Sequence, residues 1–166
     1  MCRREGTILS EYTNYSAALT DGKIIIAVDF RGLGETADPA LYSDAKYWNF
    51  EYRNAMTSMH VGRPIMGQRV MDFLTLLDFC SENEMLKEHT IKVYASGVYG
   101  PVAIHAAFLD KRISEVSISR SLKSWRSYIE NPLQRDMYSN VLYGVLRYYD
   151  LPDLIKLTSG SVKYAD

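Results

Sequence analysis

Four stretches of the chain carry hydrophobic patterns typical of β-strands. Residues 23–30 (KIIIAVDF) form a near-continuous apolar run, which is typical of a strand buried on both faces of a parallel sheet. Shorter β-branched or alternating runs occupy residues 91–95, 113–119 (ISEVSIS) and 161–165. We therefore predict four strands, each separated from the next by a longer connection.

The connections between these runs have helical periodicity. In residues 65–80 one stripe of a helix collects the apolar side chains of Ile65, Val70, Phe73, Leu74 and Leu77. Further helices are predicted at 52–59, from Pro101 onward, at 133–148, and from 150 to 154, where Asp150 or Leu151 forms the cap and Pro152 the first turn. Residues 121–131 form a loop or a short helix.

Alternating strands and helices predict an α/β fold. We expect a three-layer sandwich whose mainly parallel sheet has about four strands. The 166 residues, 47% hydrophobic and 23% charged, match a single domain spanning 1–166. No stretch reaches the ~20 apolar residues of a membrane helix, and the first residues lack the apolar core of an export signal. We expect a soluble chain, cytoplasmic by default and without membrane partners.

Charge and candidate ligands exclude several classes of function. The net charge is −1 and the basic residues are scattered, which argues against a nucleic-acid surface. Cys2 and Cys80 belong to no metal-binding pattern, and Cys80 is predicted to be a buried free thiol. No pair of histidines has the spacing of metal ligands. We therefore expect neither a metal nor a cofactor.

The strand-to-helix corner within residues 92–107 (KVYASGVYGPVAIHAA) has the layout of a nucleophile elbow. The pattern G-x-S-x-G is absent. Matching from the first glycine puts Tyr99 in the nucleophile position. Matching backward from the helix puts Gly97 there, and we prefer this register; Gly100 completes the turn. Ser96 is one residue early, and a shift of one residue on a strand turns a side chain to the opposite face.

Four segments carry a family pattern: IAVDFRGLGET (26–36), GRPIMGQRVMD (62–72), the corner and its helix (92–110), and YYDLPDL (148–154). Together they resemble the α/β-hydrolase superfamily, in particular its bacterial acetyl-xylan-esterase-like branch, over residues 23–166. The resemblance implies three strands before residue 23. It also implies a catalytic acid near Asp166 and a catalytic histidine beyond the end of the chain.

Three functions remain open on this basis. The first is a non-catalytic relative of these esterases, a binding or assembly module, because the nucleophile position lacks a serine. The second is a carboxylic ester hydrolase that deacetylates carbohydrates, with Ser96 as nucleophile, Asp166 as acid and His60 as base, or with residues from a partner chain. The third is a phosphate- or nucleotide-binding domain that uses the Gly97 turn. Gly32-x-Gly34 lacks the third glycine of a dinucleotide fingerprint.

The resemblance implies strands that the chain lacks, and these missing strands bear on its binding partners. In the family's sheet, an absent strand lies between the strands at 23–30 and 91–95. Direct pairing, residues 6–12 or another subunit must fill this gap, and an unpaired edge predicts a homo-oligomer. A cluster of aromatic residues could stack on an acetylated sugar or cover the core, and we favour cover; it comprises Tyr42, Tyr47, Trp48, Phe50 and Tyr52.

Two further interpretations concern individual charged residues and histidines. Asp29 and Arg31, at the end of the first predicted strand, are expected to form an ion pair that fixes the following loop. His105 is expected to be a core histidine, and His89 to be solvated.

Overall fold

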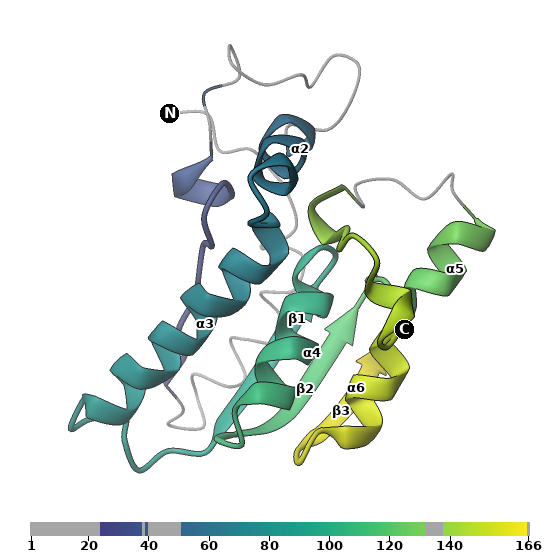
Figure 1. The fold of residues 1–166 in the computed structure, drawn as a ribbon. Coiled ribbons are helices and arrows are strands. Elements are labelled where there is room, and N and C mark those ends of the chain that lie inside the picture. The colour runs from purple at the N-terminus through teal and green to yellow at the C-terminus, as the bar shows by residue number, and fades with distance from the viewer. Residues whose placement is uncertain (1–23, 38, 40–50, 132–137, 166) are drawn as a thin grey trace.

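The computed structural model describes residues 24–37, 39, 51–131 and 138–165. Its strands are β1 (Ile91–Ser96), β2 (Ile113–Ser119) and β3 (Ser161–Ala165), all parallel and ordered β1-β2-β3 (Figure 1). These strands confirm three of the four predicted ones and the α/β class with a parallel sheet. The aromatic residues at 42, 47, 48 and 50 lie outside the described residues.

The helical elements are short except for α3 and α4. They are η1 (Gly34–Thr36), α2 (Tyr52–His60), α3 (Ile65–Glu82), α4 (Tyr99–Leu109), α5 (Trp125–Glu130), η3 (Tyr138–Asn140), η4 (Val145–Arg147) and α6 (Leu151–Leu157). The predictions for α2, α3, α5 and α6 are confirmed. Among the helices of the described residues, none combines the length and the apolar character that a membrane crossing requires.

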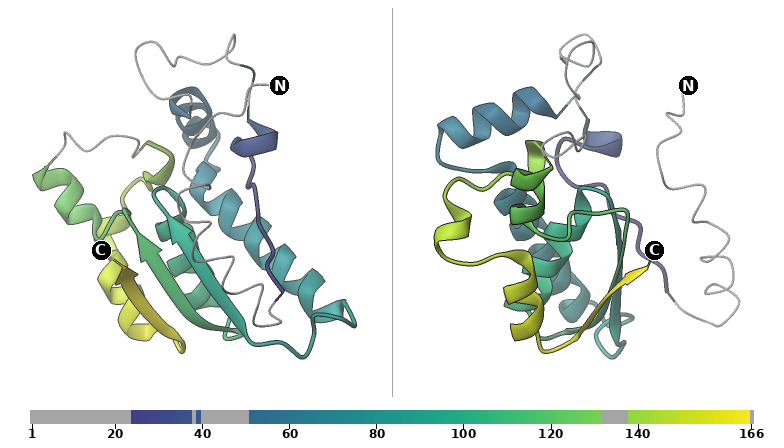
Figure 2. Two further views of the ribbon diagram at one scale, coloured as in Figure 1. Left: turned by 180° about the vertical axis from the view of Figure 1, so that it is seen from behind. Right: turned by 90° about the vertical axis from the view of Figure 1, so that its right-hand side faces the viewer.

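The two faces of the sheet have different surroundings. Helices α3, α4 and α6 lie on one face (Figure 2). On the other face Glu115 of β2 accepts from Lys92 Nζ and from Lys163 Nζ of the flanking strands, both at 3.0 Å. The expected third layer is not found within the described ranges, where the fold has two layers, and this row of charges suits a face open to water.

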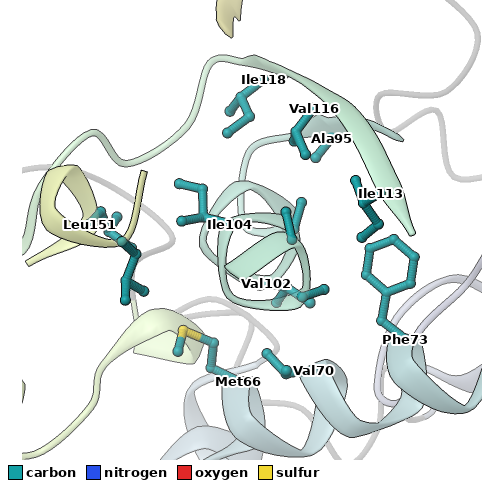
Figure 3. Close-up of a cluster of buried hydrophobic side chains, with 14 of the residues drawn as sticks. Met66, Val70, Phe73, Ala95, Val102, Ile104, Ile113, Val116, Ile118 and Leu151 are labelled. Atoms are coloured by element: carbon teal, nitrogen blue, oxygen red, sulfur yellow. The ribbon is translucent and has the colours of Figure 1, made fainter. Parts of the chain in front are cut away.

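Helix α4 is the centre of the core. Its residues Gly100–Ala107 are all buried, and all of them except His105 are apolar, as expected of a helix enclosed by protein. Figure 3 shows Val102 and Ile104 between α3 (Met66, Val70, Phe73), the strands (Ala95, Ile113, Val116, Ile118) and Leu151 of α6. Helix α4 begins two residues before Pro101, which occupies the first turn, where its missing N–H costs nothing.

The strand predicted at 23–30 is wrong within the described residues, which begin at Ile24. Residues 24–30 are free of helix and strand, and within the part of the chain that the structure describes β1 pairs with β2 alone. Figure 2 shows the segment beyond the outer edge of β1, beside α3. Only Phe30 is buried, with its ring centroid 5.6 Å from those of Phe73 and Tyr99. An apolar run becomes a strand only where a neighbour supplies hydrogen bonds, and none does here.

The helix predicted at 133–148 is also wrong in its described part, residues 138–148. Two 3₁₀ turns, η3 and η4, replace it, and Gly144 between them has a φ of +73°. A left-handed residue interrupts an α-helix, and glycine adopts that conformation without steric cost.

Candidate functional site at the elbow corner

The corner between β1 and α4 is held by backbone hydrogen bonds. Gly97 has a φ of +60°, which favours glycine. Its N–H donates to the Ser119 carbonyl at 3.0 Å, and its own carbonyl accepts from the Ser121 hydroxyl at 2.6 Å. A Cβ built on Gly97 meets no atom within 4 Å. The turn therefore has the shape of an elbow with free space at the position of the missing side chain.

Ser96 faces away from the helical layer. Ala95 is buried beneath α4, and Ser96 alternates with it to the opposite face. There the Ser119 hydroxyl donates to Ser96 Oγ at 3.1 Å, across the paired positions of β1 and β2. A serine hydroxyl becomes a nucleophile through a base within hydrogen-bond reach. The described part of the chain gives Ser96 a second serine instead.

His60 and His105 form their hydrogen bonds with groups other than Ser96. His60 is exposed at the end of α2, with Nδ1 2.7 Å from the Met56 carbonyl oxygen. His105 is buried in α4, with Nδ1 2.6 Å from the Pro101 carbonyl oxygen. Burial lowers the pKa of His105, although the bond to Pro101 opposes this. His105 is thus the predicted core histidine, and neither ring bonds to Ser96. Asp166 lies outside the described residues.

Tyr99, the alternative occupant of the nucleophile position, is a packing residue. Its ring contacts Phe30. Burial raises the pKa of Tyr99 to about 12; Asp29 and Glu51 add to the rise, whereas Arg69 opposes it. A phenol with such a pKa stays protonated at neutral pH and is a weak acyl acceptor.

The glycine-rich loop is fixed, but by different partners from those expected. Asp29 and Arg31 do not pair with each other. The Glu35 N–H donates to the Asp29 carboxylate at 3.1 Å. Arg31 pairs with Asp72 of α3 and donates to Gln68 Oε1 at 2.7 Å. The Asp29 side chain binds the backbone of the loop, whereas the Arg31 side chain binds helix α3.

A buried ion pair behind this loop was missed by sequence reasoning. Arg69 of α3, with 1% of its side chain exposed, pairs with Glu51 and donates to the Arg31 carbonyl from Nε at 3.1 Å and Nη2 at 2.9 Å. One signal was available: Arg69 lies four residues after Ile65 and four before Phe73, on the buried stripe. A charge on that stripe indicates a buried partner.

Neither a metal site nor a relative of known function can be assigned to the described part of the chain. Within the described ranges, no three side chains of His, Cys, Asp or Glu gather as metal ligands would. Cys80 is a buried free thiol, as predicted. No protein-family model, no curated protein and no solved structure matches the chain.

Proposed function

We propose that the chain is an α/β-hydrolase-like assembly module without serine-hydrolase activity, and that its open β1 edge binds a second copy of the chain. The observation that carries the proposal is the exposed apolar segment beside that edge. Ile24, Ile25, Ile26 and Val28 are 48%, 37%, 45% and 36% exposed. Large exposed apolar patches mark interaction surfaces more often than they mark free surface.

A second copy suits both features of this region. Among the described residues, β1 is an edge strand of the sheet, and an edge strand can pair with a strand of a second copy. A two-fold axis beside the edge reverses strand direction, so the two β1 strands meet antiparallel. The same axis brings each Ile24–Val28 segment toward the partner, where its apolar side chains leave water.

The corner geometry supports the non-catalytic part of the proposal. Gly97 has no side chain to offer, and Ser96 bonds to Ser119 on the face away from α4. Deacetylation of sugars through Ser96 requires a base within hydrogen-bond reach of its hydroxyl. Such activity is the alternative function, and finding it would contradict the proposal. The phosphate-binding alternative stays a prediction, as does the acetylated sugar ligand.

The test is the mass of the full chain in solution as a function of concentration. By light scattering after size exclusion, the wild type should approach the mass of two chains as concentration rises. The double variant Ile24→Lys/Ile26→Lys should stay at the mass of one chain, because lysine keeps the segment in water.

The matched control is Leu157→Lys, which charges a side chain that is 69% exposed at the end of α6, just before β3 at the other edge of the sheet. It should associate like the wild type, and circular dichroism should show all three proteins folded. A wild-type monomer at every concentration, or equal association of the double variant, would contradict the proposal.

A further inference from the structure

A second feature, unrelated to the β1 edge, is a cavity of about 460 Å³ beside the break between α2 and α3. None of the corner residues lines it. Its walls come from that break and from residues 142–149, and they include Met59, Pro64, Leu142, Tyr143, Tyr148 and Tyr149. The volume is in the range of small-molecule sites, which are mostly apolar with a few polar groups.

One wall of the cavity is fixed in place before any ligand arrives. The Pro101 carbonyl can only accept a hydrogen bond, so the neutral ring of His105 carries its proton on Nδ1. His105 Nε2 then accepts from the Tyr149 hydroxyl at 3.0 Å. The Trp125 ring packs against both rings, with centroids 5.8 Å from His105 and 6.0 Å from Tyr149. Tyr149 thus presents a pre-organised aromatic surface.

The other tyrosines leave flat rings in water. Tyr143 is 93% exposed and Tyr148 is 84% exposed. Exposed aromatic rings gain much when a flat apolar group covers them, because each ring has a large surface and few conformations to lose. Together with Tyr149, these rings favour a ligand with a flat, apolar body.

Two exposed arginines next to lining residues in the chain indicate the polar part of such a ligand. Exposed Arg63 lies between Gly62 and Pro64, which both line the cavity, and exposed Arg147 directly precedes Tyr148. Among the described residues, those that line the cavity carry no charged side chain, so the two arginines lie next to the lining and not in it. Guanidinium groups bind two oxygens of a carboxylate or of a tetrahedral oxyanion through two parallel hydrogen bonds. We propose that this cavity binds a small anion with a flat apolar body, an aromatic carboxylate or sulfonate.

Isothermal titration of the full chain with naphthalene-2-sulfonate tests the proposal. We expect saturable binding of one molecule per chain. The neutral naphthalen-2-ylmethanol should bind about tenfold more weakly, since it loses a charge-assisted hydrogen bond. The double variant Arg63→Gln/Arg147→Gln should weaken binding of the sulfonate but not of the alcohol, and Tyr148→Ala should weaken both.

Matched variants separate this cavity from the rest of the surface. Arg126→Gln removes an exposed arginine of α5, and Tyr94→Ala removes a tyrosine of β1 that is 64% exposed; both should bind like the wild type. Thermal unfolding of each variant reports whether it folds. Absence of saturable heat, equal binding of the neutral compound, or equal weakening by the control variants would overturn the proposal.

Discussion

At the scale of single residues, the corner contains two glycines that meet different surroundings. Gly97 has a positive φ and open space around its missing side chain. A Cβ on Gly100 would lie 2.0 Å from Ser121 Oγ and 2.7 Å from Ser121 Cβ. Glycine is therefore required at the first position by the backbone and at the second by close packing of α4 against the segment after β2.

This difference predicts which second substitution restores stability. Gly97→Ala and Gly100→Ala should each lower the free energy of unfolding, by about 1–2 kcal/mol for the left-handed backbone and about 1–3 kcal/mol for overpacking. Adding Ser121→Gly should recover part of the loss for Gly100→Ala, because it removes the clash. Chemical denaturation of the wild type, the three single variants and the two double variants measures both double-mutant cycles.

For Gly97→Ala, Ser121→Gly should bring no recovery, because it leaves the left-handed backbone in place and removes the hydroxyl that donates to the Gly97 carbonyl. Equal recovery in both cycles would contradict this explanation of the corner.

At the scale of elements, one carboxylate caps two helices. Asp150 accepts from the Leu151 N–H at 2.7 Å at the start of α6 and from the Trp125 N–H at 2.8 Å at the start of α5. The Ser124 hydroxyl also donates to it, at 2.6 Å. The N-terminus of a helix favours a negative charge. Asp150 thus joins α5 and α6, which lie far apart in the sequence.

Asp150→Ala should lower the free energy of unfolding by about 2 kcal/mol, the upper end for loss of an N-cap, because α6 loses its cap and α5, which keeps Ser124 as its N-cap, loses a further acceptor. Burial opposes ionisation of Asp150, but the hydrogen bonds from Ser124, Trp125, Leu151 and Arg126 outweigh it and lower its pKa. The contribution of the Asp150 carboxylate to the free energy of unfolding is therefore complete well above pH 3.8. It is lost as the pH falls through that value toward the lowered pKa of the folded chain.

Urea denaturation at several pH values measures this contribution. The difference between wild type and Asp150→Ala should shrink as acid protonates the carboxylate. Asp153→Ala is the matched control, since its carboxylate accepts from the Asp150 N–H of the capping box at 3.0 Å and pairs with Lys156 at 4.0 Å, both at α6. A loss for Asp153→Ala as large as that for Asp150→Ala would contradict the double role.

Elements whose pattern and partner lie close together in the chain could be predicted from the sequence. Strands β1 and β2 flank the helix that covers them, and α3 carries its own apolar stripe. The segment at 24–30 has an equally clear pattern, but a strand requires a neighbour, which no local pattern reports. The fate of residues 138–148 depended on whether Gly144 would adopt a left-handed backbone, which helical periodicity does not reveal.

The candidate site divides in the same way. The corner at Gly97 was visible as a turn of small residues between a strand and a helix. The Arg69–Glu51 pair and the bond between His105 and Tyr149 were not visible, because each joins residues that only the folded chain brings together. Expected partners that are near in sequence, such as Asp29 and Arg31, were wrong for the same reason.

At the scale of the whole molecule, the candidate catalytic residues that the structure describes do not converge. Ser96 lies on the outer face of the sheet, whereas His60 ends α2 and bonds to a backbone carbonyl. Geometry sets the first requirement for acid–base assistance, before any pKa matters.

We therefore expect the purified chain to hydrolyse an aryl acetate no faster than its Ser96→Ala variant, and a serine-reactive fluorophosphonate to leave Ser96 unmodified. Absorbance of the released phenol and mass spectrometry of the labelled peptide provide the readouts. The heat-unfolded chain serves as control for reaction of the ester with surface side chains. Turnover that disappears with Ser96, together with label on Ser96, would establish an active elbow.

The continuity of β1, α4 and β2 along the chain also has a consequence for the order of folding. These elements occupy residues 91–119 without interruption and make most of their contacts with one another and with α3 just before them. Contacts between close parts of a chain cost little entropy to form. The centre of the chain can therefore become structured first, after which Phe30 and β3 add to a surface that already exists.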